Sequence, residues 1–312
     1  MPQFVNLDAG ESIFFARELE TIRAGNYDVK FQEPKLFNII PKSMEGDPTI
    51  DTITHRIFTR TGLAKMGGTE YANDFPRVDV FGTEVSVKVK PIHAGYGYNK
   101  DEIARAAKVG RPLEAKRAEA ARKAIDMKLD EIARSGEATT GLYGLYNFPG
   151  TSSLIVADGV STTTTWSTKT SDEILADLYS LYNYSLTSTG GMETINTIAL
   201  PMAQYLLIAQ KRLSDDNEIT VLQYFQKNVA TPVNVIWLQG LETAAPSNAL
   251  YDSLCMGIGW NNSPDKLVMD LPVSFEQLEV ERNGMDYSVG CRSKTAGVLF
   301  FYPLSCVKIN GI

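Results

Sequence analysis

The sequence predicts an α+β fold, and three patterns along its 312 residues support that prediction. Residues 50–60 and 84–90 alternate between apolar and polar positions, which indicates a pair of β-strands. Residues 99–135 repeat apolar residues at helical spacing, which indicates a long helix. Residues 194–238 read as strand, helix, helix and strand, the order of a small α/β layer. The length favours two compact units.

The N-terminal part predicts a helix followed by an extended arm. Apolar residues recur near helical spacing in residues 11–24, and Gly25 with Asn26 ends the pattern. Pro34 and Pro41 interrupt the next stretch, and proline prevents a regular helix there. We therefore expect an extended arm that lies on another surface.

The two alternating segments predict one long hairpin with a wide tip near residues 61–77, where glycines and a proline gather. An isolated hairpin is only marginally stable in water. Its stability must therefore come from a neighbouring surface, either in the same chain or in another subunit.

The long helix is divided at residues 110–112, because Pro112 cannot continue a helix but fits its first turn. We expect the apolar stripe of the second piece, residues 112–135, to face a strand-rich sheet of its own domain. The stripe consists of Ala118, Ala121, Ile125, Leu129 and Ile132. Basic and acidic residues alternate on the remaining surface, which favours a solvated helix with salt bridges over a phosphate-binding surface.

The second half of the chain mixes helices and strands. Residues 139–165 are rich in Gly, Thr and Ser and contain a short strand at 154–157. Thr170 and Glu173 match a capping box at the start of a helix. There follow a buried strand over 194–200, helices over 201–213 and 220–227, and a strand over 233–238.

The tail, residues 266–312, is strand-rich. Its strands are expected within residues 266–271, 288–292 and 296–309. Residues 298–302 are apolar at successive positions, which predicts a central strand buried on both faces.

Catalytic and metal-binding motifs do not occur in the sequence. Cys255, Cys291 and Cys306 are far apart and odd in number, so we expect reduced, packed thiols. His55 lies within a strand pattern and His93 just after one, and neither has an acidic or thiol partner at a useful spacing.

Two further candidates have simpler structural explanations. The acidic run at 215–218 is expected to end one helix and cap the next rather than bind a metal ion. Lys65 is expected to lie in the flexible end of the hairpin. We therefore predict no catalytic, cofactor-binding or metal-binding residues, and no enzyme activity.

Composition and charge limit the class of protein to which the chain can belong. Apolar residues make up 44% and charged residues 21%, which excludes wholesale disorder. The net charge is -7, and all of the acidic surplus lies in residues 139–312. The acidic second half of the chain argues against a dedicated nucleic-acid-binding protein, but not against a protein that merely encloses nucleic acid. No apolar run approaches the roughly 20 residues that span a bilayer, and the N-terminus shows no secretory signal.

Several segments, in order along nearly the whole chain, resemble the major capsid proteins of tailed bacteriophages. They are FFARELETI (14–22), residues 95–150 ending in LYGLYNFPG, LPMAQYLLI (200–208), TVLQYFQKN (220–228) and residues 271–307. No single motif is diagnostic, and the resemblance rests on the order and spacing of all of them.

The resemblance implies the tailed-phage capsid fold, which encapsulins and the floor of herpesvirus capsids share. Its parts would be an N-terminal arm (1–48), an extended E-loop hairpin (49–93), a P-domain with a long spine helix (94–165), an α/β A-domain (166–262) and return strands of the P-domain (263–312). Because the arm begins at once, we expect a separate scaffold protein or none.

The function implied is that of a structural protein of the virion. Copies would assemble in the host cytoplasm into hexamers and pentamers of an icosahedral shell that encloses double-stranded DNA without sequence-specific binding. Portal, scaffold or decoration proteins are possible partners, and no membrane or cofactor is implied. An encapsulin-like shell around protein cargo is the alternative, and a soluble α/β enzyme is a third hypothesis.

Overall fold

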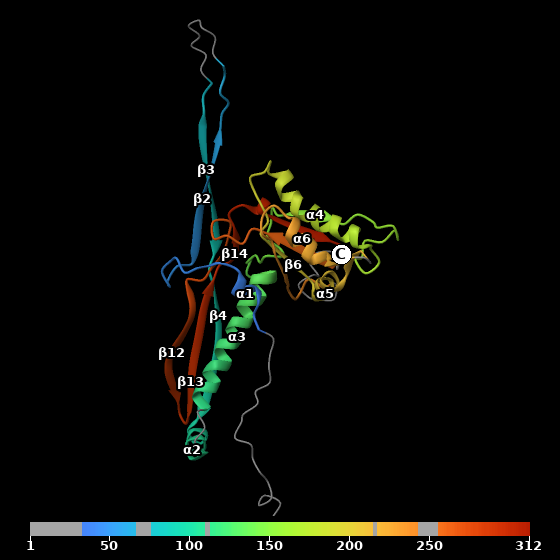
Figure 1. Cartoon of the computed structure of the whole chain (residues 1–312). Helices are drawn as coiled ribbons and strands as arrows, with labels where there is room; N and C mark the ends of the chain where they lie inside the picture. The colour runs from blue at the N-terminus through green and yellow to red at the C-terminus, as the bar shows by residue number, and fades with distance from the viewer. Residues whose placement is uncertain (1–32, 67–75, 110–112, 215–216, 243–254) are drawn as a thin grey trace, which may run out of the picture. The chain divides into compact units, whose positions relative to one another are not determined.

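The computed structural model describes residues 33–66, 76–109, 113–214, 217–242 and 255–312 (Figure 1). The helix predicted over residues 11–24 lies outside these ranges. Contacts divide the chain into two units, Met1–Glu33 and Pro34–Ile312, and every element named below belongs to the second.

The segment between the two prolines is not fully extended, which corrects the prediction of an arm without helix. It forms one helical turn, α1 (Leu36–Ile39), since the prolines lie outside that turn. Leu36 and Phe37 are buried, and the backbone N–H of Phe37 donates to Asp130 Oδ1 at 3.0 Å. Strand β1 (Lys42–Ser43) then pairs in parallel with β11 (Leu267–Asp270). The surface under this segment therefore belongs to the same chain.

The predicted hairpin is confirmed, although its second strand begins at Asp79 and ends at Lys88 instead of spanning residues 84–90. Strands β2 (Thr52–Thr61) and β3 (Asp79–Lys88) pair antiparallel along their full lengths, from Thr52 opposite Lys88 to Thr61 opposite Asp79. They form a two-stranded sheet of their own.

A three-stranded sheet carries the long helix. Its strands, in spatial order, are β12 (Val273–Asn283), β13 (Asp286–Thr295) and β4 (Lys90–Asn99). The sequence patterns predicted neither β4 nor β12, and His93 lies inside β4 rather than after a strand. The chain passes from β4 into α2 (Lys100–Val109) and then into α3 (Leu113–Ser135), as predicted.

Helix α3 packs through the predicted stripe. Ala121, Ile125, Leu129 and Ile132 are buried, while Ala118 is half-buried. The helix contacts β4, β13, α1 and β14 (Gly297–Phe300). The prediction that this stripe faces a sheet of the same chain is therefore confirmed.

The prediction of a central strand at 298–302 is wrong. Among the strands that the structure describes, β14 pairs with β11 alone and lies at the edge of the sheet β1–β11–β14. All four of its residues are nevertheless buried. Beyond the edge, the backbone N–H of Val298 donates to the carbonyl oxygen of Tyr143, so a loop covers the strand. Burial on both faces thus came from packing of other segments, not from a second neighbouring strand.

The buried apolar side chains form two cores, one around the α3 stripe and one around helix α4 (Ser171–Ser188). A five-stranded sheet contributes side chains to both cores. Its strands, in order, are β5 (Ser152–Ile155), β15 (Cys306–Asn310), β10 (Met256–Trp260), β6 (Thr197–Leu200) and β9 (Asn234–Trp237). Alternate residues face opposite cores: Ile258 packs with the α3 stripe, whereas Ile198 packs with helix α4 (Ser171–Ser188). The predicted α/β layer is confirmed, because β6 and β9 are parallel and α5 (Met202–Gln210) and α6 (Val221–Asn228) lie between them in sequence.

Capping residues in the local sequence determine where helices α4 and α6 begin. Thr170 and Glu173 form the predicted capping box of α4, and Thr220 with Gln223 forms a second one at α6. Of the acidic run at 215–218, Asp215 and Asp216 lie outside the described residues, and the other two residues correct the prediction. Asn217 and Glu218 lie in strand β8 (Asn217–Thr220), which pairs antiparallel with β7 (Arg212–Ser214), and helix α5 ends at Gln210.

Candidate functional site

The hairpin β2–β3 is the most exposed regular element and has two distinct faces. In an antiparallel pair, alternate residues and their directly opposite partners share a face. We call the two faces the arginine face and the histidine face. The arginine face consists of Thr52, Thr54, Arg56, Phe58, Arg60, Val80, Gly82, Glu84, Ser86 and Lys88. The histidine face consists of Ile53, His55, Ile57, Thr59, Thr61, Asp79, Phe81, Thr83, Val85 and Val87.

The arginine face combines an exposed aromatic ring with basic side chains. Phe58 is 66% exposed although its ring lies over Gly82, where an added β-carbon would be 3.3 Å from Phe58 Cε1. Arg56 Nε donates to Glu84 Oε1 at 2.9 Å across the strands, in a pair exposed to solvent. Such an exposed ion pair contributes little to stability. This face therefore offers apolar surface and positive charge to a partner.

Within the described ranges, the histidine face contacts the body of the chain at its base. The His55 ring meets Phe301 edge-on, with 5.5 Å between the ring centroids. The backbone N–H of Val89 donates to the carbonyl oxygen of Asp51 at 2.9 Å and closes the base of the hairpin. Farther from the base, Phe81 is 57% exposed and Ile57 is also exposed. His55 is thus a half-buried residue that packs between the hairpin and the body of the chain.

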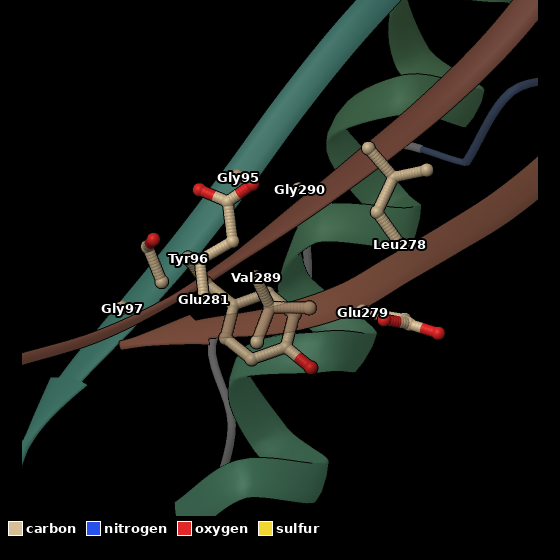
Figure 2. A pocket seen from close by; sticks show the side chains of 9 residues that line it. Gly95, Tyr96, Gly97, Leu278, Glu279, Glu281, Val289 and Gly290 are labelled. Carbon is tan, nitrogen blue, oxygen red and sulfur yellow. The ribbon is translucent and has the colours of Figure 1, made fainter. Parts of the chain in front are cut away.

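A groove of about 490 Å³ crosses the sheet β12–β13–β4 (Figure 2). Cys291 packs in the core with the α3 stripe, so its neighbour Gly290 faces the opposite side of the sheet. Gly95 lies directly opposite Gly290, and Gly97 lies opposite Ser288. We call this feature the glycine groove; its lining is Gly95, Tyr96, Gly97, Leu278, Glu279, Glu281, Ser288, Val289 and Gly290.

The wall of the glycine groove is formed by β12 (Figure 2). Leu278 lies over Gly290, where an added β-carbon would be 3.2 Å from Leu278 Cδ1. Glu279 and Glu281 are exposed beside it. The groove therefore presents a backbone floor, one apolar side chain and two carboxylates.

A buried ion pair holds the loop before α4. Lys169 Nζ lies 2.7 Å from Asp177 Oδ2 and also 2.7 Å from the carbonyl oxygen of Ala157. Trp166 Nε1 donates to the same carboxylate oxygen at 3.0 Å. Burial raises the pKa of Asp177, although both donors act to lower it. These hydrogen bonds tie the loop before α4 to the first turns of that helix.

The cysteines are packed thiols, as predicted. Cys291 and Cys306 are buried, Cys255 is half-buried, and all three are free. Burial raises the pKa of Cys255 to about 11 and that of Cys306 to about 12. The thiolate is the nucleophilic form of a thiol, so these raised pKa values disfavour reaction of the side chains near neutral pH.

The described part of the chain holds no group of three or more His, Cys, Asp or Glu side chains arranged to bind a metal ion. His93 is exposed on β4, and Lys65 lies beyond the end of β2 near the tip. Asp215 and Asp216 lie outside the described residues. Within the described ranges, no helix is both long and apolar enough to cross a bilayer. The surfaces that distinguish the described part of the chain are therefore the two hairpin faces, which the alternation in the sequence had indicated, and the glycine groove, which sequence patterns had not located.

Solved structures of phage capsid proteins share the arrangement of helices and strands of this chain. The structure "The capsid of Myoviridae Phage XM1" has a TM-score of 0.79 at 17% identity, covering 96% of this chain and 99% of that one. Gordonia phage Cozz gives a TM-score of 0.61 at 13% identity, covering 99% and 98%. A virus-like particle from Pyrococcus furiosus gives 0.52 at 11% identity, covering 88% and 91%. A search of curated protein sequences finds no match.

The fold is that of tailed-phage capsid proteins, with a long hairpin, a spine helix on a sheet, and an α/β layer. The model of the major capsid protein family matches residues 62–312. The chain therefore belongs to the major capsid protein family, whose members are structural components of the phage shell and hence of the virion.

Proposed function

We propose that copies of this chain form the hexamers and pentamers of an icosahedral shell that encloses double-stranded DNA. The observation that carries the proposal is a hairpin with exposed aromatic side chains on both faces. Large exposed apolar patches on soluble proteins mark interaction sites. A shell would bury these patches, because each subunit contacts several other copies, and many modest contacts together stabilise the assembly.

The histidine face is the part of the hairpin that we assign to the neighbouring subunit. Its base already packs on Phe301 of the same chain, and Ile57 and Phe81 extend the apolar surface beyond that contact. A neighbouring subunit beside the body of this one would cover the part of the histidine face that lies beyond Phe301. The assignment makes residues 49–93 the E-loop of the capsid fold.

We assign the other parts of that fold to the regions expected from sequence. The arm is 1–48, the P-domain is 94–165 with 263–312, and the A-domain is 166–262. A portal, and a scaffold or decoration protein, are proposed partners in an assembly that takes place in the host cytoplasm.

The charge supports a container rather than a DNA-binding protein. The net charge of -7 repels DNA on average, and a strongly basic wall would bind the genome tightly. Because no catalytic step is involved in enclosing DNA, we propose that the chain is not an enzyme.

Electron microscopy of particles from cells that express the chain tests this function. Closed shells with hexameric and pentameric units are expected. A chain that remains monomeric at high concentration would contradict the proposal. Shells isolated from infected cells should contain DNA, whereas shells that hold only protein cargo would favour the compartment alternative.

A further inference from the structure

We propose that Asn283 is a modification site, at which the side-chain amide is lost spontaneously by reaction with the backbone nitrogen of Gly284. An asparagine followed by glycine is intrinsically prone to this reaction, because glycine has no side chain to crowd the attacking nitrogen. The pair occurs twice in the chain, at Asn283–Gly284 and at Asn310–Gly311. The structure leaves the first pair open and holds the second in place. The inference does not depend on the assembly of a shell.

The reaction consumes water and releases ammonia. The backbone nitrogen of Gly284 loses its proton and attacks Cγ of Asn283, so an N–Cγ bond forms, the Cγ–Nδ2 bond breaks, and Nδ2 leaves as ammonia. The product is a cyclic succinimide. Water then adds to one of the two ring carbonyl carbons and breaks its bond to nitrogen. The result is either aspartate or isoaspartate, in which the backbone runs through the former side chain.

Asn283 and Gly284 lie at the exposed tip that joins β12 to β13 (Figure 1). Asn283 pairs with Asp286, which leaves Gly284 and Met285 as a two-residue turn. Gly284 has a φ of 64°, as expected for the glycine that opens a type II′ turn. A glycine is therefore required at this position, and it places the reactive pair where few contacts restrain the backbone.

Both reacting groups of this pair are available. Among the described residues, the carboxamide of Asn283 and the backbone N–H of Gly284 form no hydrogen bond. Arg282 Nε donates to the carbonyl oxygen of Gly284 at 3.0 Å and so leaves the nitrogen of that residue uncovered. The guanidinium also places a positive charge near the nitrogen that must lose its proton, and positive charge stabilises the resulting anion.

The second pair is held on both sides. Asn310 lies in β15, between β10 and β5 in the five-stranded sheet, and its Nδ2 donates to Ser153 Oγ at 3.0 Å. The backbone N–H of Gly311 donates to the carbonyl oxygen of Cys255 at 2.8 Å. The attacking nitrogen is therefore engaged, and the sheet would have to open before the ring could form. Local opening costs more free energy in a central sheet than at a hairpin tip.

Modification changes the charge of the tip. Asp286 lies directly opposite position 283, and its carboxylate accepts from Asn99 Nδ2 at 2.8 Å. An aspartate at position 283 would place a second carboxylate opposite the first, and like charges directly opposite destabilise a strand pair. Isoaspartate would also lengthen the backbone at the end of β12. Either product adds a negative charge to a chain whose net charge is -7.

Peptide mapping by mass spectrometry of the whole unassembled chain, incubated folded at pH 8, tests the proposal. Trypsin cleaves after Arg and Lys, so residues 283–292 and 309–312 are released as separate peptides, each with a single asparagine. Asn283 should be converted at least about tenfold faster than Asn310, because the central sheet opens more rarely than the tip. Equal rates, or an Asn283 that stays intact while Asn310 reacts, would overturn the proposal.

Denaturation and substitution supply the controls. In guanidinium at the same pH the two rates should agree within about threefold, since unfolding removes the contacts that protect Asn310. A tenfold difference that persists there would overturn the structural explanation. Asn283→Gln should abolish the more acidic species that ion exchange separates, because the longer side chain closes its ring far more slowly, whereas Asn310→Gln should leave that species unchanged. An acidic species that persists in Asn283→Gln would overturn the assignment of the site.

Discussion

Truncation of Leu129 tests how the spine helix is held. Leu129 has no exposed surface and lies in the core between Ile125 and Ala133 of the same helix. Helix α3 contacts β4, β13, β14 and α1, so the site is enclosed by several elements and cannot collapse easily. Leu129→Ala should therefore leave a cavity.

The expected loss follows from the atoms removed. Each buried methylene or methyl group contributes about 0.8 kcal/mol, so removal of the three carbons of the isopropyl end costs about 2.5 kcal/mol in transfer free energy. The cavity raises the loss in the free energy of unfolding to about 3–5 kcal/mol, because the enclosed site relaxes only in part. For a domain of this size, each kcal/mol lowers the melting temperature by about 2–4 °C.

The assay is thermal and urea unfolding of unassembled subunits, followed by circular dichroism. Met127→Ala, on the same helix but at a 47% exposed side chain, is the matched control and should change the free energy of unfolding by less than about 1 kcal/mol. Equal stability of the two variants would refute the assignment of the buried face.

Four further outcomes are expected. Deletion of residues 61–76 should leave a folded subunit that fails to assemble, and normal shells from that variant would contradict the role of the hairpin. Lys169→Met should cost about 3–5 kcal/mol at neutral pH, because it leaves the Asp177 carboxylate buried without its cation. Burial raises the pKa of Asp177 above its ordinary value of 3.8, so this destabilisation should shrink in urea melts as the pH falls through that pKa. Free subunits should bind double-stranded DNA weakly, without sequence preference and with steep loss on adding salt; submicromolar, sequence-selective binding in a titration at physiological salt would contradict the container function. Native subunits should react slowly with a thiol reagent at pH 8, since burial raises the pKa of Cys255 to about 11 and that of Cys306 to about 12; rapid labelling would show the thiols to be accessible.

Sequence patterns determined the elements whose signals are local. The alternation in β2 and β3, the apolar stripe of α3 and the Thr170–Glu173 capping box each depend on residues within one or two turns or strands. Spacing along the chain decides which side chains share a face, so these features follow from sequence alone. The order of the elements was also enough to indicate the capsid family.

Strands with mixed patterns could not be predicted. Strand β4 carries glycines and tyrosines at alternate positions, and β12 carries glutamates and two irregularities in its register. Both are strands because β13 lies between them and supplies the hydrogen bonds. Pairing with a distant segment overrides weak local propensity. The same reasoning explains β14, whose apolar run reflects burial by a loop and not a central place in the sheet.

Only the tertiary structure decided which surfaces remain open. Gly95 and Gly290 are almost two hundred positions apart in sequence, and they form one floor because β4 and β13 pair in a particular register. Whether the faces of β2 and β3 are covered depends likewise on every other element. Among the described residues, the body of the chain covers the base of the histidine face and leaves Ile57, Phe58 and Phe81 exposed. Exposure is a property of the whole packing, since each residue's surroundings come from segments that the local sequence does not contain.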